Sequence, residues 1–141
     1  MIFEVNNYMN SFNLLKSFQS SWAKHKYWVM SRSQQAYNEI RLLAKGNDWS
    51  LEKQKAYEKI LIDLEKIQPT DQTLRVTYQH VWGYFKKLAT IEEKQRYLDM
   101  IDQSILLDSQ LESFLKELSI KYNQEYLLQM RWLLDDKDKY S

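Results

Sequence analysis

The sequence contains no cysteine, one proline and two glycines among its 141 residues. Without cysteine the chain cannot supply a thiolate nucleophile, a CxxC redox pair, a cysteine-ligated zinc site or the ligands of an iron–sulfur cluster. Few glycines and one proline favour short turns, whereas 44% hydrophobic and 28% charged residues are typical of amphipathic helices. The composition therefore predicts helices joined by short loops, and it excludes several classes of enzyme.

Long apolar runs are also missing. The chain has no run of about 18 apolar residues that could span a bilayer. Residues 1–10 have neither the basic start nor the long apolar stretch of a secretory leader. A chain of this length can bury a core of its own, so we expect one domain over residues 1–141. We further expect a cytoplasmic protein that does not enter a membrane.

The two signs of charge are unevenly distributed along the chain. Residues 1–87 hold thirteen Lys or Arg against eight Asp or Glu, whereas residues 88–141 hold seven against eleven. The formal charges are thus +5 and −4, although the whole chain carries only +1. A basic half can meet a polyanion, but an imbalance of this size is also common in proteins that bind nothing charged.

Apolar residues recur at steps of three and four, which predicts an all-α, single compact bundle of about seven helices. Leu74, Tyr78, Val81, Phe85 and Leu88 form one such seam, which we expect to be buried. The predicted helices cover residues 10–30, 34–44, 51–67, 71–88, one from 91, one from 110, and 124–134, before a polar tail at 135–141.

Capping residues set most of these boundaries. A hydroxyl or carboxylate at the first turn satisfies backbone N–H groups that the helix leaves free, and a glycine after the last turn accepts the left-handed conformation. Pro69 is expected to close the third helix. The expected caps are Ser31 or Ser33, Gly46, Ser50, Thr70, Thr90 with Glu93, and Ser109 with Glu112.

Two short segments combine cations with aromatic residues: 24–28, with sequence KHKYW, and 80–87, with sequence HVWGYFKK. Cations bind phosphate groups, whereas aromatic rings can stack on exposed bases, so this mixture of residues suits RNA. Most such residues in helical proteins are nevertheless ordinary core and rim. On the helix over 71–88, Gln79, His80, Gly83, Lys86 and Lys87 fall on the side opposite the apolar seam.

Gly83 is expected inside a helix, where glycine costs about 1 kcal/mol relative to alanine. Its presence there indicates a close approach by another group, either a packed neighbouring helix or a ligand such as a phosphate. Arg75 lies on the same broad face, so a strip from Arg75 through Gln79 to Lys86 can follow a phosphate backbone. Lys86 and Lys87 also suit a helix end without any ligand, because their charge complements the exposed carbonyls.

The two histidines are candidates for catalysis or metal binding. Neither His25 nor His80 has an Asp, Glu or His three or four residues away on its own helix face, so we expect no metal site and no cofactor. His25 is expected to be a hydrogen-bonded histidine of the core or its rim, and His80 to be exposed. No nucleophile motif or phosphate-binding glycine loop is present.

Three segments, HKYWVMSRSQQAYNEIRLLA, HVWGYFKK and EYLLQMRWL, match in order the signatures of a known family. The sequence resembles the YbgA-like family, domain of unknown function 1722, over about residues 18–133. The family usually continues into a proline-containing ending, whereas this chain has LDDK at 134–137. The resemblance implies a domain that in many bacteria is fused to an iron–sulfur desulfidase acting on thiolated uracil or on thiouridine in tRNA. There it looks like the tRNA-holding part, and genes of the family often lie beside photolyase genes.

We therefore expect a non-catalytic nucleic-acid-binding domain, with RNA and above all tRNA as its ligand, linked to thiouridine desulfuration or to photodamage. The alternative is a protein-interaction adaptor for a separately encoded desulfidase or photolyase. A small enzyme, which needs a pocket near His25 or His80, is the weakest hypothesis. Tyr27 and Tyr84 are expected to stack on bases. Gln79 is expected to lie along the bound phosphate backbone, and the phosphate contacts are expected around Gly83. The expected phosphate contacts are Lys24, Lys26, Arg32, Arg75, His80, Lys86 and Lys87.

Overall fold

The computed structural model describes residues 11–107 and 110–134, and within these ranges all regular structure is helical. This confirms the predicted all-α class and the predicted number of helices. The α-helices are α2 (Ser11–Arg32), α3 (Gln34–Ala44), α4 (Leu51–Leu64), α5 (Asp71–Trp82), α6 (Ile91–Ile101), α7 (Leu111–Lys121) and α8 (Glu125–Gln129), and a 3-10 turn, η1 (Lys45–Asn47), follows α3.

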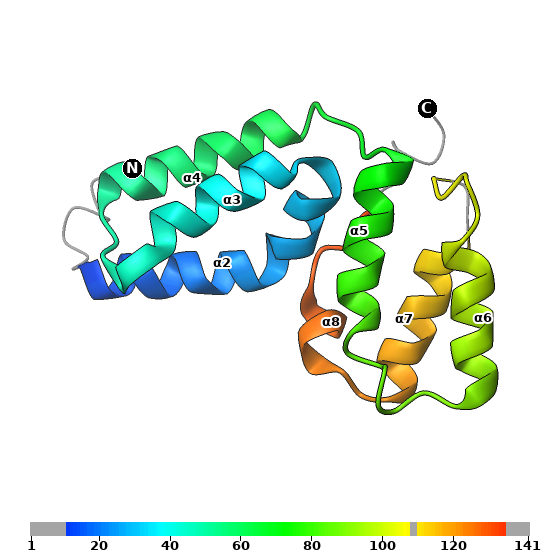
Figure 1. Cartoon of the computed structure of the whole chain (residues 1–141). Coiled ribbons are helices and arrows are strands. Elements are labelled where there is room, and N and C mark those ends of the chain that lie inside the picture. Colours follow the sequence, from blue (N-terminus) through cyan, green and yellow to red (C-terminus); the bar gives the residue numbers. More distant parts are fainter. Residues whose placement is uncertain (1–10, 108–109, 135–141) are drawn as a thin grey trace.

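The helices form two groups that share α2 (Figure 1). Helices α2, α3 and α4 lie side by side and make an elongated arm, whereas α5 to α8 gather at one end of it. α2 contacts α3, α4 and α5, so it belongs to the packing of both groups. The buried apolar residues form one cluster, in which Trp28, Tyr57, Tyr78 and Phe85 are among the largest side chains. The arm and the remaining helices therefore share one continuous core.

Side-chain caps start four of the helices as predicted. Ser33, rather than Ser31, caps α3 by accepting a hydrogen bond from the N–H of Ala36, and Ser50 accepts one from Lys53. Thr70 and Thr90 each form a reciprocal capping box with the residue three positions later. These boundaries follow from local chemistry that the sequence contains in full.

The predicted ends of three helices are wrong. α4 ends at Leu64 rather than at Ile67, and α5 ends at Trp82 rather than at Leu88. After Trp82 the backbone continues through tighter turns, in which the N–H groups of Gly83 and Tyr84 bond to carbonyls three residues back. Phe85 is still buried by these turns, but Leu88 is 48% exposed and does not belong to the core.

The last predicted helix is also too long, because α8 ends at Gln129. Residues 130–134 form a strap whose backbone groups bond to other elements instead of to one another. The N–H of Arg131 donates to the carbonyl of Lys24 at 2.8 Å, and the carbonyl of Leu133 accepts from Arg32 at 2.7 Å. These partners replace the bonds that a longer helix would make. The strap thereby ties the C-terminal end of the described chain to α2.

The expected capping box of α7 pairs Glu112 with Ser109, which lies outside the described residues. Glu112 itself is buried at 4% exposure. Its carboxylate accepts hydrogen bonds from the Tyr78 hydroxyl at 3.4 Å and from the N–H of Leu134 at 3.0 Å. Glu112 therefore joins α7 to α5 and to the strap.

Candidate functional site

The two segments that mix cations with aromatics meet through Tyr27 of α2 and Tyr84, which follows α5. Their hydroxyls lie 3.2 Å apart and their rings pack edge to face, with centroids separated by 6.3 Å. Tyr126 of α8 completes this tyrosine cluster, since its ring stacks on Tyr84 and meets Tyr27 edge to face. Residues about a hundred positions apart in the sequence thus converge where the arm joins the remaining helices.

Burial has a clear effect on the protonation of this cluster. It raises the pKa of the Tyr27 hydroxyl, and the hydrogen bond with Tyr84 and the nearby tyrosines add to the shift. Burial also raises the pKa of Tyr126. Tyr27 and Tyr126 are therefore neutral hydrogen-bonding groups near pH 7 and do not act as bases.

Two hollows flank the same part of α2. One of about 600 Å³ lies between α2 and α3 and is lined by Trp22, Asn38, Arg41, Leu42, Ala44 and Lys45. The other, of about 210 Å³, lies between α2 and α8 and is lined by Ser20, Ala23, Lys24, Tyr126 and Gln129. Both bring cations close to aromatic rings.

Lys26 feels the charge of Arg41, which lines the first hollow. Its ammonium group is 5.5 Å from the centroid of the Tyr27 ring. Burial lowers the pKa of Lys26, and the charge of Arg41 lowers it further. An anion at this point would relieve both effects. We define the junction surface as Lys24, Lys26, Arg41, Lys45, Tyr84 and Tyr126.

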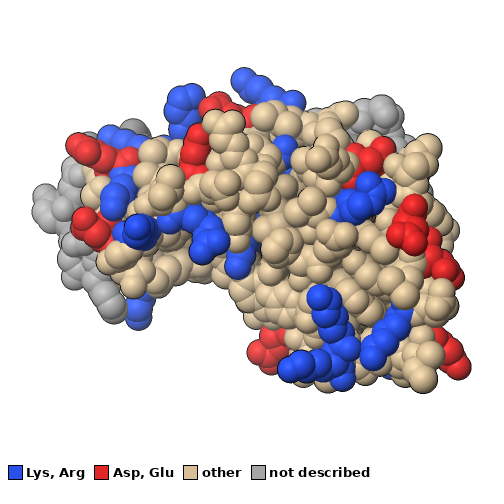
Figure 2. All heavy atoms as spheres, viewed as in Figure 1, with Lys and Arg blue, Asp and Glu red and all other residues tan. Residues whose placement is uncertain are grey.

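A second group of cations lies where α5 leads into α6. Lys86 and Lys87 are exposed in the turn, and Lys94 is exposed on α6. We call these three lysines the corner cations. Lys86 and Lys94 also line a hollow of about 290 Å³ together with Trp82, Tyr97 and Leu98. Figure 2 shows Lys and Arg side chains on one face of the molecule, both along the edge of the arm and at the end where α5 meets α6.

Several residues predicted to bind nucleic acid are accessible. Lys24 is exposed, and Lys26 and Tyr84 are half-buried at the junction surface. The remaining exposed residues of the predicted set are Gln79, His80, Gly83, Lys86 and Lys87.

Three other predicted residues serve the fold. Tyr27 is only 6% exposed, so its ring cannot stack on a base in this structure. Arg32 is equally buried and donates to the Ser31 hydroxyl and the Leu133 carbonyl. Arg75 is half-buried and donates to the carbonyls of Ile101 and Gln103 at the end of α6. In this structure the Arg75 guanidinium, the first residue of the predicted phosphate strip, is therefore already hydrogen-bonded to the backbone.

The interpretation that a neighbouring helix packs against Gly83 is wrong. Within the described chain, a Cβ added at Gly83 would meet only the backbone of His80, whose carbonyl oxygen lies 3.0 Å away. This backbone belongs to the preceding turn of the same segment. The missing side chain of Gly83 thus leaves room for the His80 carbonyl, and the residue is exposed.

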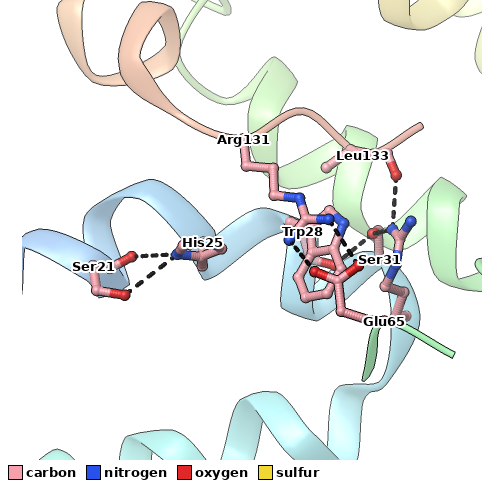
Figure 3. A network of polar contacts seen from close by, with 8 residues as sticks. Ser21, His25, Trp28, Ser31, Glu65, Arg131 and Leu133 are labelled. Carbon is pink, nitrogen blue, oxygen red and sulfur yellow. Dashed lines mark hydrogen bonds and ion pairs between the residues drawn. The ribbon is translucent and has the colours of Figure 1, made fainter. Parts of the chain in front are cut away.

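His25 is a hydrogen-bonded histidine at the rim of the core, and His80 is exposed, both as expected. The Nδ1 atom of His25 lies 2.9 Å from the Ser21 carbonyl, and burial lowers the pKa of the imidazole. Figure 3 shows His25 one turn before Trp28, around which Arg131, Glu65 and Ser31 gather. Residues 11–107 and 110–134 contain no group of three His, Asp or Glu side chains placed to hold a metal ion.

Sequence reasoning missed four residues of these surfaces: Arg41, Lys45, Lys94 and Tyr126. Arg41 and Lys45 follow Asn38 at steps of three and four, a spacing that places them on one side of α3 and of the turn that follows it. That spacing was a usable signal. The sequence around Tyr126 and Lys94 contains no such signal, because their roles depend on contacts with segments far away in the sequence.

The sequence profile of the family described as "Protein of unknown function (DUF1722)" matches residues 26–135. The chain belongs to this family. The DUF1722 match includes Tyr27, Tyr84 and the strap, whereas Lys24 and His25 lie before its first residue. No curated protein and no solved structure is similar enough to this DUF1722 protein to count as a match. Among the described residues, no helix is both long enough and apolar enough to cross a bilayer.

Proposed function

We propose that this DUF1722 protein is a non-catalytic nucleic-acid-binding domain whose ligand is RNA, with tRNA as the first RNA to test. The observation that carries the proposal is the contact of Tyr27 with Tyr84, which brings the two basic segments of the sequence together. The cations on both sides of this contact point to a polyanion that spans them. A link to tRNA desulfuration or to photodamage rests on the resemblance alone.

The chemistry of the junction surface suits an RNA backbone with unpaired bases. Lys24, Lys26 and Arg41 supply positive charge, and the partial burial of Lys26 favours an incoming anion. Tyr84 and Tyr126 are half-buried, so part of each ring is open to a base, whereas Tyr27 supports them from below. The corner cations extend the charged surface beyond the tyrosines.

The test is fluorescence anisotropy of labelled bulk tRNA from about 50 to 200 mM salt, because phosphate contacts make affinity fall steeply with salt. We expect saturable binding, weakened both by Lys26→Glu with Arg41→Glu and by Lys86→Glu with Lys87→Glu. Each charge-reversed variant is expected to show a shallower dependence on salt.

The matched control is the double variant Lys59→Glu with Lys66→Glu, which reverses two exposed charges on and just after α4. This variant changes the net charge by the same amount but touches neither basic surface. Equal loss of affinity in all three double variants would mean attraction by net charge alone and would refute the assigned surfaces. Absence of binding at the lowest salt concentration would refute the proposed function.

A further inference from the structure

The outer face of α6 exposes large apolar side chains. Ile91 is 85% exposed and Leu98 is 51% exposed, and these two residues lie seven positions apart, on one side of the helix. Ile105, seven residues further and beyond the end of α6, is 60% exposed. Figure 1 places α6 at the edge of the molecule, with α7 beside it. The apolar stripe of α6 is therefore left uncovered by the described part of the chain.

The stripe borders the hollow of about 290 Å³ between the end of α5 and α6. Its inner wall contains Trp82 and Tyr97, whose rings stack with centroids 4.1 Å apart and an angle of 5° between their planes. Leu98 belongs both to the stripe and to the lining. Both rings are buried, at 7% and 5% exposure, so the hollow has an apolar floor able to receive one side chain.

The charges beside the stripe define what can cover it. Lys86 and Lys94 line the hollow on one flank, whereas Glu92 and Asp99 project toward the other side of α6 by helical phase. Glu93 is already occupied by Lys121 and Tyr122 of α7 and just after it. A partner that buries the stripe thus meets two ammonium groups at the hollow, which need carboxylates when they lose water.

We propose that the α6 stripe (Ile91 and Leu98) and the adjoining hollow form a docking surface for an acidic amphipathic helix of a partner protein. One aliphatic side chain of that helix enters the hollow over Trp82 and Tyr97. Carboxylates on the flank of the partner helix pair with Lys86 and Lys94. This helix-against-helix mode uses side chains three, four and seven positions apart as anchors.

The experiment uses the full chain labelled with ¹⁵N and a synthetic acidic peptide of about 14 residues, or four helical turns, with leucines on one face and glutamates beside them. Two further peptides serve as controls: a scrambled peptide of the same composition, and one in which lysines replace the glutamates. We expect the acidic amphipathic peptide to shift amide signals mainly within residues 82–98. Calorimetry gives its affinity for each variant.

Leu98→Glu is expected to weaken binding at least about tenfold. Ile120→Glu changes an aliphatic residue on α7 that is 70% exposed, and it should leave the affinity unchanged. Lys94→Glu should weaken the binding of the acidic peptide and strengthen the binding of the peptide in which lysines replace the glutamates. Because Leu98 and Ile120 are both exposed, neither variant is expected to unfold the protein.

Four outcomes would overturn the proposal. The first is that the acidic peptide shows no saturable binding up to about 1 mM. The second is that the scrambled peptide binds equally well. The third is that the protein self-associates in sedimentation and that Leu98→Glu abolishes this association, which would assign the stripe to a second copy of the chain. The fourth is that tRNA displaces the peptide and that Leu98→Glu weakens tRNA binding as much as it weakens peptide binding, which would assign the stripe to RNA. Lys86 and Lys94 belong both to the corner cations and to this surface, so the proposed RNA function is tested separately through Lys26 and Arg41, which lie outside it.

Discussion

The guanidinium carbon of Arg131 lies 3.8 Å from the centroid of the Trp28 ring, and both terminal nitrogens of Arg131 donate to the carboxylate of Glu65 (Figure 3). The guanidinium of Arg32 lies 4.5 Å from the same indole ring. Trp28 is thus in contact with two cations while it is only 1% exposed. This arrangement holds the strap against α2 and α4, so the position of α8 and Tyr126 depends on it.

Replacing Arg131 tests this relationship. Arg131→Ala removes the contact with Trp28 and the paired hydrogen bonds to Glu65, so we expect a loss of about 1–2 kcal/mol in the free energy of unfolding. Arg131→Lys should lie between this variant and the wild type, because lysine keeps the charge but not the forked geometry. Urea unfolding measures both values. Lys66→Ala, an exposed control, should change the stability by less than about 0.5 kcal/mol.

Truncating Glu112 should destabilise the protein more strongly. The carboxylate of Glu112 is buried and accepts from Leu134 and Tyr78, so Glu112→Ala leaves those donors without this partner. We expect a loss of about 2–4 kcal/mol, together with faster hydrogen exchange at the Leu134 amide. The exposed Glu117 on the same helix serves as control. If Glu117→Ala and Glu112→Ala lower the free energy of unfolding by the same amount, the carboxylate of Glu112 does not hold the strap.

Local chemistry made much of the fold predictable. Ser50, Thr70 and Thr90 begin their helices as the sequence indicates, and Gly46 takes the left-handed conformation expected after α3, with φ of 84°. Each of these boundaries depends on groups only a few residues apart.

Long-range partners explain what the sequence did not reveal. Arg32 looks like a surface cation, but its hydrogen-bond partner Leu133 lies 101 positions away. Arg75 likewise binds carbonyls 26 and 28 positions away. The early end of α8 has the same origin, because the strap bonds to α2 and α7 instead of continuing the helix. Spacing along one helix gives no information on such contacts.

Acid should weaken the contact between α6 and α7 through Glu93. Burial alone would raise the pKa of this carboxyl, but hydrogen bonds from Lys121, Tyr122 and the N–H of Thr90 lower it to about 2, from an ordinary 4.5. A carboxyl with a lowered folded-state pKa stabilises the protein above its unfolded pKa, and this contribution is lost as the pH falls toward the folded value. We therefore expect the stability of the wild type to fall between about pH 4.5 and 2.

The measurement is urea unfolding at several pH values across this window, with Glu93→Gln as the test variant. Glu93→Gln cannot titrate, so its stability should be lower at neutral pH and should depend less on pH than that of the wild type. Glu92→Gln, an exposed neighbour on α6, is the control and should follow the wild-type curve. Parallel curves for the wild type and Glu93→Gln would contradict the assigned role.

The two glycines should respond differently to alanine. Gly46 has a φ of 84°, where an L side chain is strained, so Gly46→Ala should cost about 1–2 kcal/mol in stability. Gly83 has a φ of −53° and a ψ of −27°, which any residue adopts. Among the described residues, an added Cβ comes close only to the backbone carbonyl of His80, whose oxygen lies 3.0 Å away, so the strain offsets the entropy gained by removing a glycine. We expect Gly83→Ala to change the stability by less than about 1 kcal/mol.

Gly83→Ala also decides whether RNA approaches the backbone at this turn. If tRNA is held by the corner cations and the junction surface, tRNA affinity should stay within about twofold of wild type, because no cation is lost. A larger loss of affinity in a variant with wild-type stability would instead place an RNA backbone against Gly83, where a methyl group blocks its approach. Anisotropy at one fixed salt concentration, with Gly46→Ala measured beside it, separates this effect from a general loss of folded protein.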